Sequence, residues 1–134
     1  MNSLVIDASV ALKWFVEEDG SLKARKLLKD LQRGLLSVYV PQPFFFEVAN
    51  FVSRRCGADA LLVEKSLDLF FSLDFQTEAI SAEFIENTVS FARRYGLTAY
   101  DASYLALADL YEVPLLTSDR KLKEKVKLPF VKLL

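Results

Sequence analysis

The chain is 134 residues long, with 52% apolar and 26% charged residues and a formal net charge of −1. This length and apolar content predict one globular domain over residues 1–134 with a buried core, and they exclude intrinsic disorder. No apolar run is long enough to span a bilayer, and no basic, apolar leader precedes Asp7. We therefore expect a cytoplasmic protein without a membrane span or a secretory signal.

Missing residue types restrict the chemistry. The sequence contains no histidine and a single cysteine, Cys56. It therefore cannot form an intramolecular disulfide, a Cys-based zinc site, a Ser-His-Asp triad or a Cys-His dyad. All glycines are isolated, so neither a GxGxxG nor a Walker-type phosphate loop is present. Any catalysis must use carboxylates, lysines, hydroxyl groups or a metal ion held by oxygen.

The N-terminal part of the chain alternates short apolar runs with amphipathic segments. Residues 4–6 predict a strand, and apolar residues at helical spacing follow over 10–15. Apolar and charged residues separate onto two faces over 21–34, which predicts an amphipathic helix that ends at a glycine. Residues 37–40 predict a second strand because they are β-branched and aromatic, and a helix is expected over 44–55.

The same alternation continues to the C-terminus. Helices are predicted over 59–71, 81–95, 101–111 and 120–127, and strands over 73–75, 113–116 and 129–133. The helix over 101–111 is almost wholly apolar and should be buried on most sides. In the helix over 81–95 the expected apolar face contains Phe84, Ile85, Val89, Ala92 and Tyr95. This order of elements predicts a three-layer α/β/α sandwich around a mainly parallel, twisted sheet of four to five strands.

Acidic residues stand where such a sheet would bind ligands, at the carboxyl ends of its strands. Asp7 follows the first strand, Asp119 follows the strand over 113–116, and Glu47 lies one turn into the helix after the second strand. Asp101 is expected to begin the buried helix. We expect these four carboxylates to converge on one rim.

Each acid also has a simpler interpretation. Asp7, Asp101 and Asp119 stand near helix starts, where aspartate is favoured as an N-cap and by the helix dipole. Glu47 could lie on a solvated helix face, although the segment around it is apolar. No basic residue is close to Glu47 or Asp101 in sequence, which points to a cation supplied from outside. Clustered carboxylates without histidine or thiolate favour Mg²⁺ or Mn²⁺, and such a site can hydrolyse phosphodiesters.

Four segments carry a resemblance to a known family: Asp7 in VIDAS, Glu47 in FFEVAN, Asp101 in LTAYDASYLALA and Asp119 in LLTSDRKL. Together they resemble PIN-domain ribonucleases, and among these the VapC-like toxins of toxin-antitoxin modules. The resemblance covers the whole chain and is most specific around Asp101. It implies a PIN-like fold and an endoribonuclease that cleaves RNA with Mg²⁺ or Mn²⁺.

The resemblance also implies residue roles and partners. Asp7, Glu47, Asp101 and Asp119 would bind the metal ion and position the attacking water. Ser9, Asn50 and Thr117 match polar positions that would support the acids, although ordinary turn hydroxyls and a solvated helix position explain them equally well. The family further implies a homodimer and a small cognate antitoxin that covers the acidic groove.

Two surface features bear on partners. Basic residues are concentrated after Asp119, and Arg120, Lys121 and Lys123 could contact the RNA backbone, or could simply form a solvated helix face. The chain also has 11 Phe, five Tyr and one Trp, and Phe91 falls outside the expected apolar face of its helix. This surplus of aromatic residues suggests a protein-protein surface.

Other functions fit the sequence less well. A haloacid-dehalogenase type phosphatase would need a second aspartate where Ser9 stands, and a receiver domain would need acids before the first strand, where Asn2 and Ser3 stand. A PIN nuclease of RNA processing or decay has the same residues as a toxin. A non-catalytic module that binds RNA or protein also remains an alternative.

Overall fold

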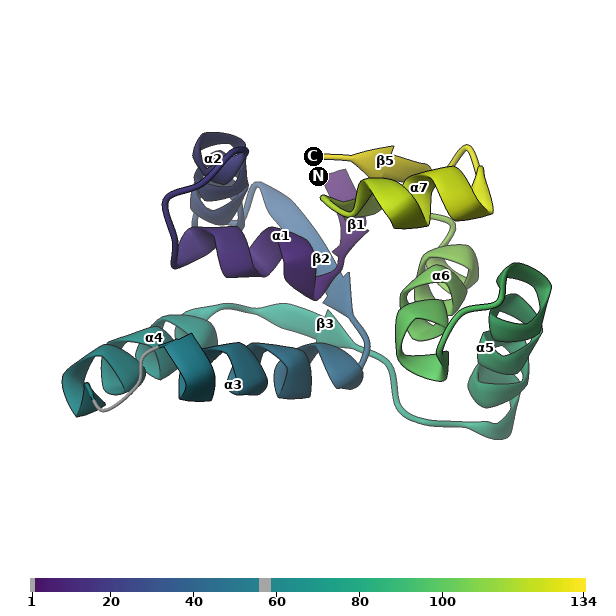
Figure 1. Ribbon diagram of the computed structural model, residues 1–134, viewed down its shortest axis with the longest axis horizontal. Helices are drawn as coiled ribbons and strands as arrows, with labels where there is room; N and C mark the ends of the chain where they lie inside the picture. The colour runs from purple at the N-terminus through teal and green to yellow at the C-terminus, as the bar shows by residue number, and fades with distance from the viewer. Residues whose placement is uncertain (1, 56–58) are drawn as a thin grey trace.

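A five-stranded parallel sheet forms the centre of this computed structural model, which describes residues 2–55 and 59–134 (Figure 1). Every pairing is parallel, and the spatial order is β3-β2-β1-β4-β5. The bounds are β1 Asn2–Ile6, β2 Leu36–Val40, β3 Phe75–Thr77, β4 Leu115–Thr117 and β5 Val131–Leu133. All the strands therefore end at the same edge of the sheet. Cys56 lies outside the described residues.

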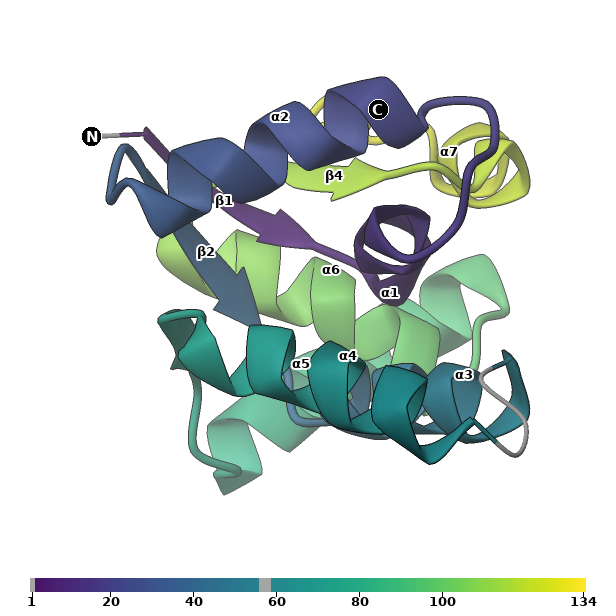
Figure 2. The same cartoon turned by 90° about the vertical axis from the view of Figure 1, so that its left-hand side faces the viewer.

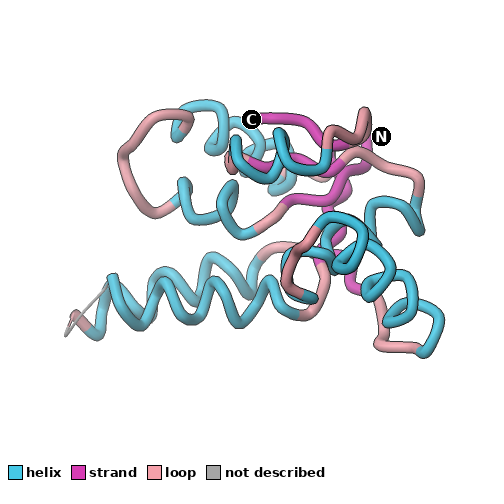
Figure 3. Tube along the Cα trace, turned by 45° about the vertical axis from the view of Figure 1, so that its right-hand side comes forward, coloured by secondary structure: helices cyan, strands magenta, loops and turns pink. Residues whose placement is uncertain are grey.

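Helices cover both faces of the sheet, so the predicted α/β/α sandwich is confirmed (Figure 2). Helix α6 packs on one face with α5 outside it, whereas the 3-10 turn η1 and helix α2 pack on the other. Helices α3 and α4 lie side by side and extend beyond the sheet (Figures 1 and 3). The bounds are α1 Ala8–Ala11, η1 Leu12–Trp14, α2 Ser21–Gln32, α3 Pro43–Arg55, α4 Ala60–Ser72, α5 Ala82–Tyr95, α6 Ala99–Tyr111 and α7 Arg120–Val126.

Aromatic side chains join the helices to the sheet. On the α2 face, Phe70 of α4 lies 5.9 Å from Trp14 and 5.9 Å from Phe75, measured between ring centroids. The Trp14 indole N–H also donates to the backbone oxygen of Ala24 at 2.9 Å, which fixes η1 against α2. These contacts explain much of the aromatic surplus as core packing.

Several predicted boundaries were wrong by two residues, among them the starts of β1, β4 and β5, and two of these errors have a clear physical reason. Helix α6 begins at Ala99 instead of Asp101, because the Thr98 hydroxyl caps it by accepting the Asp101 N–H at 3.1 Å. Strand β3 begins at Phe75 because Leu73 still closes α4, with its N–H on the Phe70 oxygen. Phe75 pairs with Val38, which places its ring on the Trp14 side of the sheet.

The expected apolar face of α5 was right for Phe84 and Tyr95 and wrong for Ile85 and Val89. Phe84, Thr88, Phe91 and Tyr95 face the core, whereas Ile85 and Val89 are 43% and 46% exposed. Phe91 therefore packs inside instead of marking an outer surface, and its ring stacks on Tyr95. The helix buries the face that carries its aromatic rings, because these rings bury more apolar area than Ile85 and Val89 would.

No helix in the described part of the chain is long and apolar enough to cross a membrane.

Adjacent phenylalanines on α4 test this packing. Phe70 is 7% exposed and Phe71 is 84% exposed. Phe70→Ala should lower the free energy of unfolding by about 3–5 kcal/mol, because it leaves a cavity beside Trp14. Phe71→Ala, the matched control, should change it by less than about 0.5 kcal/mol. Urea unfolding measures both, and equal effects of the two substitutions would contradict this position of α4.

Candidate functional site

The strand order reverses beside β1, and the first acid lies at this point. From β1 the chain continues to β2 and β3 on one side of the sheet, and later to β4 and β5 on the other. Ile6 pairs with Leu116, and the Asp7 N–H donates to the Leu116 oxygen at 3.2 Å. This register puts Asp7 next to Thr117. Such a reversal is where open α/β sheets bind ligands.

Asp7 is buried and held by hydroxyl groups. Its side chain is at the N-cap position of α1 but caps nothing, so the cap interpretation is wrong for it. Instead, the Ser9 and Thr117 hydroxyls donate to its two carboxylate oxygens. The Ser118 N–H donates to Ser9 Oγ and the Asp119 N–H donates to Thr117 Oγ1, each at 3.0 Å. The turn after β4 thereby orients both hydroxyls toward Asp7.

Burial dominates the ionisation of Asp7. It raises the pKa of Asp7 from 3.8 to about 6, and the negative charge of Asp119 adds to the rise. The Ser9 and Thr117 hydrogen bonds oppose the rise because they stabilise the carboxylate. The chain therefore holds a carboxylate that ionises only with difficulty in the absence of a cation.

Glu47 lies on α3 beside the helix face that buries Phe44 and Val48. Its carboxylate is half-buried and accepts a hydrogen bond from the Tyr104 hydroxyl of α6 at 3.1 Å. Burial, followed by the charges of Asp101 and Asp7, raises the pKa of Glu47. Burial and the Glu47 charge also raise the pKa of Tyr104, so that its hydroxyl stays protonated and remains a donor.

Asp101 is the third residue of α6, and it is exposed. It stands in the first turn, where the helix dipole favours a carboxylate, but the cap of this helix is Thr98. Partial burial, and then the charge of Asp119, raise the pKa of Asp101. Lys125 of α7 opposes this rise, so the structure supplies a basic neighbour that is distant in sequence.

Asp119 is the N-cap of α7, so the simpler interpretation is right for this acid. Its Oδ1 accepts the N–H groups of Lys121 at 3.0 Å and Leu122 at 3.2 Å. Both bonds use the same oxygen, and the side chain is exposed. The cap therefore fixes the position of Asp119 and leaves its other oxygen free of these two bonds.

The structure brings the four predicted acids into one electrostatic group. Asp7 and Asp101 act on Glu47, and Asp119 acts on Asp7 and Asp101, in each case opposing ionisation. Within residues 2–55 and 59–134, no three acidic side chains have the spacing of a preformed metal site. The donors nevertheless fit a hard cation, because all are oxygen atoms and their mutual repulsion would be relieved by positive charge.

The other predicted site residues differ in their contacts. Ser9 and Thr117 touch Asp7, whereas Asn50 lines a hollow beside Glu47. Among the predicted RNA contacts, Arg120 and Lys121 are exposed next to Asp119. Lys123 instead donates to the backbone oxygen of Val131 at 2.6 Å, which joins α7 to β5.

Three residues of the site were missed from the sequence. Tyr104 holds Glu47, Ser118 orients Ser9, and Lys125 faces Asp101. Of these three, only Ser118 could have been suspected from the sequence, because it lies between the predicted site residues Thr117 and Asp119. Tyr104 and Lys125 reach the site from helices whose mutual packing depends on the tertiary fold.

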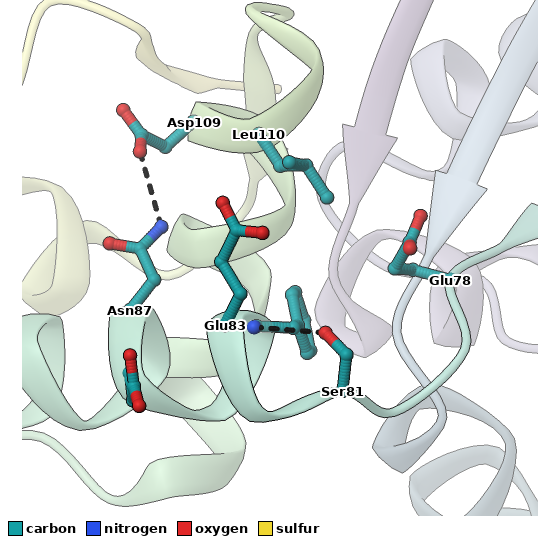
Figure 4. Close-up of a pocket in the computed structure, with 8 residues that line it drawn as sticks. Glu78, Ser81, Glu83, Asn87, Asp109 and Leu110 are labelled. Carbon is teal, nitrogen blue, oxygen red and sulfur yellow. Dashed lines mark hydrogen bonds between the residues drawn. The ribbon is translucent and has the colours of Figure 1, made fainter.

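A second acidic hollow lies between α5 and α6 (Figure 4). Glu78, Glu83, Glu86 and Asp109 line it. The Asn87 side-chain amide donates to Asp109 at 3.2 Å, which ties the two helices together. Asp109 lies near the end of α6 opposite to Asp101, and none of these acids is among the charges that raise the pKa of Asp7, Glu47 or Asp101. Because the Asn87–Asp109 contact joins α5 to α6, we assign this hollow to helix packing.

Comparisons with known proteins agree with this geometry. The profile of the family described as the PIN domain matches residues 4–128. The curated protein Ribonuclease VapC3 of Pyrobaculum aerophilum is 29% identical over 126 residues, which is 91% of this chain and 93% of that protein.

Solved structures share the fold. A toxin-antitoxin complex from Klebsiella pneumoniae matches with a TM-score of 0.70 at 18% identity, over 96% of this chain and 95% of that one. VapBC2 from Rickettsia felis, bound to a DNA fragment from its promoter, matches with a TM-score of 0.67 at 16% identity, over 98% and 97%.

The buried charge of Asp7 should affect folding stability. Because the folded pKa of about 6 exceeds the ordinary value of 3.8, the wild type should lose stability as pH rises through this interval. Asp7→Asn should not show this loss. Without divalent ions, the free energy of unfolding of Asp7→Asn should rise relative to that of the wild type by about 2–3 kcal/mol between about pH 4 and pH 7.

Urea unfolding in EDTA at a series of pH values measures this difference. Asp68→Asn on the exposed side of α4 is the matched control and should follow the wild type. A constant difference between Asp7→Asn and the wild type across the series would show that Asp7 has no raised pKa.

Proposed function

The chain belongs to the PIN-domain family, and from this premise we propose that it is a metal-dependent endoribonuclease. The observation that carries the proposal is a group of carboxylates at the carboxyl edge of the sheet, in which burial and the charge of another of the four acids raise the pKa of Asp7, Glu47 and Asp101. Like charges held together cost stability, so we attribute the group to function. The ribonuclease activity of the relative VapC3 supports RNA as the substrate.

Asp7, Glu47, Asp101 and Asp119 would hold Mg²⁺ or Mn²⁺. Such an ion supplies positive charge to a scissile phosphate and makes water a stronger nucleophile near neutral pH. Exposed Asp101 can move toward the ion, whereas Asp7, Glu47 and Asp119 are held by hydrogen bonds. This division suits a site that has rigid anchors and one adjustable ligand.

The chain's own side chains orient the acids. Ser9 and Thr117 direct both oxygens of Asp7 by donating to them, and Tyr104 does the same for one oxygen of Glu47. These three are positioning residues, because they act through the acids. Exposed Arg120 and Lys121, beside Asp119, would attract the RNA backbone. Lys123 would contribute indirectly, because its bond to the backbone of β5 holds α7 in place.

The biological role follows from the same family. We propose that the protein is the toxin of a type II toxin-antitoxin pair, forms a homodimer and acts in the cytoplasm. The toxin-antitoxin complexes among the structural relatives support a small antitoxin as partner. A small protein encoded beside this one would separate the toxin role from RNA processing or decay.

Cleavage of RNA tests the proposal directly. An end-labelled pool of structured RNA should be cut in Mg²⁺ or Mn²⁺ and left intact in EDTA. Asp101→Asn should slow cleavage on the order of a hundredfold or more, because several kcal/mol of charge stabilisation are lost. Asp109→Asn is the matched control, since it changes an exposed aspartate on the same helix and should cut like the wild type.

The possible failures have distinct meanings. Equal cutting by Asp101→Asn and the wild type would show that the site is wrong or the activity is foreign. If the folded wild type cuts no RNA with either ion, the nuclease proposal fails in favour of the non-catalytic binding module.

A further inference from the structure

A hollow of about 550 Å³ adjoins the acidic group on the side of Glu47. We call it the side hollow. Its wall includes Glu47 itself, so that it is continuous with the candidate active site. The rest of the wall is formed by Gln42, Pro43, Phe46, Asn50, Ile80 and Tyr100.

Two aromatic rings in this wall are exposed to solvent. Phe46 is 78% exposed and Tyr100 is 67% exposed. Each directly precedes a candidate metal ligand, Glu47 in α3 and Asp101 in α6. Exposed rings beside a phosphodiester site are a favourable surface for nucleobases, because every base has a π-face that can stack on them.

Two carboxamides complete the chemistry of the side hollow. Gln42 and Asn50 line it and are exposed. A carboxamide offers both a donor and an acceptor, which matches the mixed edges of nucleobases. Apolar walls with a few convergent polar groups are typical of sites that bind a small planar group.

We propose that the side hollow binds one unpaired nucleobase of the RNA substrate, packed against the rings of both Phe46 and Tyr100 with Gln42 and Asn50 at its edge. This inference rests on the proposed ribonuclease function and adds a determinant of specificity to it. Asn50 then contacts substrate instead of supporting the acids. Because a base must leave its own stack to enter, the protein should prefer single-stranded segments over duplex RNA.

The charges nearby favour RNA over a second copy of the chain as the occupant. A symmetric dimer places the same patch of both subunits in contact. Through the side hollow it would bring the two copies of Glu47 and their neighbouring acids together, and these like charges repel. An RNA strand instead brings phosphates, which a divalent cation could bridge to the acids. It also brings bases, whose flat faces fit the apolar walls of the side hollow.

Fluorescence of 2-aminopurine tests the proposal without requiring cleavage. A short single-stranded RNA that contains this base is titrated with the protein in Ca²⁺, where stacking quenches the signal. Phe46→Ala and Tyr100→Ala should each weaken binding by about tenfold or more, since each removes a stacking surface. Tyr100→Phe keeps the ring, and Phe71→Ala removes an equally exposed ring on α4, so both should bind like the wild type.

Equal affinity of all the variants would overturn the proposal. It would also fail if the alanine variants bind RNA normally but lose self-association in sedimentation, because a second copy would then occupy the hollow. The two proposals remain separable. Ring-dependent quenching without cleavage in Mg²⁺ or Mn²⁺ would keep the base site and reject the nuclease, whereas cleavage with ring-independent binding would do the reverse.

Discussion

The structure depends on a carboxylate buried at the point where the strand order reverses. Asp7 is 8% exposed, and the pairing of β1 with β4 leaves it facing Thr117. A buried charge is costly unless it is paired or hydrogen-bonded, and the hydrogen bonds of Asp7 do not cancel the cost of its burial, because its pKa remains raised. The negative charge of Asp7 therefore remains poorly compensated until a cation binds. The three other acids belong to the same uncompensated group.

The fold holds these like charges together through ordinary packing. Helix α6 is buried along most of its length, and this fixes Tyr104 toward Glu47 and Asp101 toward α7. The cap of α7 fixes Asp119. Each acid is thus positioned by an element that is stable for its own reasons. The stability of the packed core offsets the repulsion between the acids, and local ion pairs do not.

The sequence was sufficient to predict the fold and to select four acids that the structure brings into one electrostatic group, but it did not reveal what surrounds each acid. Asp7 could be placed because it directly follows a short apolar strand, and Asp119 because it lies in the turn after another. The start of α6 was misplaced because Thr98, a hydroxyl cap, was not distinguished from Asp101 three residues later. Tyr104 and Lys125 could not be found, because their contacts with the acids depend on how α6, α3 and α7 pack. The outer face of α5 was misjudged because periodicity alone did not separate Ile85 and Val89 from Phe91.

Titration calorimetry with Mn²⁺, in buffers that differ in ionisation enthalpy, tests the central claim most directly. If the four acids form one cation site, the wild type should bind Mn²⁺ near pH 6 and release protons, because Asp7, with a pKa of about 6, is then partly protonated. Proton release should decline toward pH 8, and Asp7→Asn should bind Mn²⁺ far more weakly. Equal affinity of Asp7→Asn and the wild type, with no proton release from either, would contradict this account.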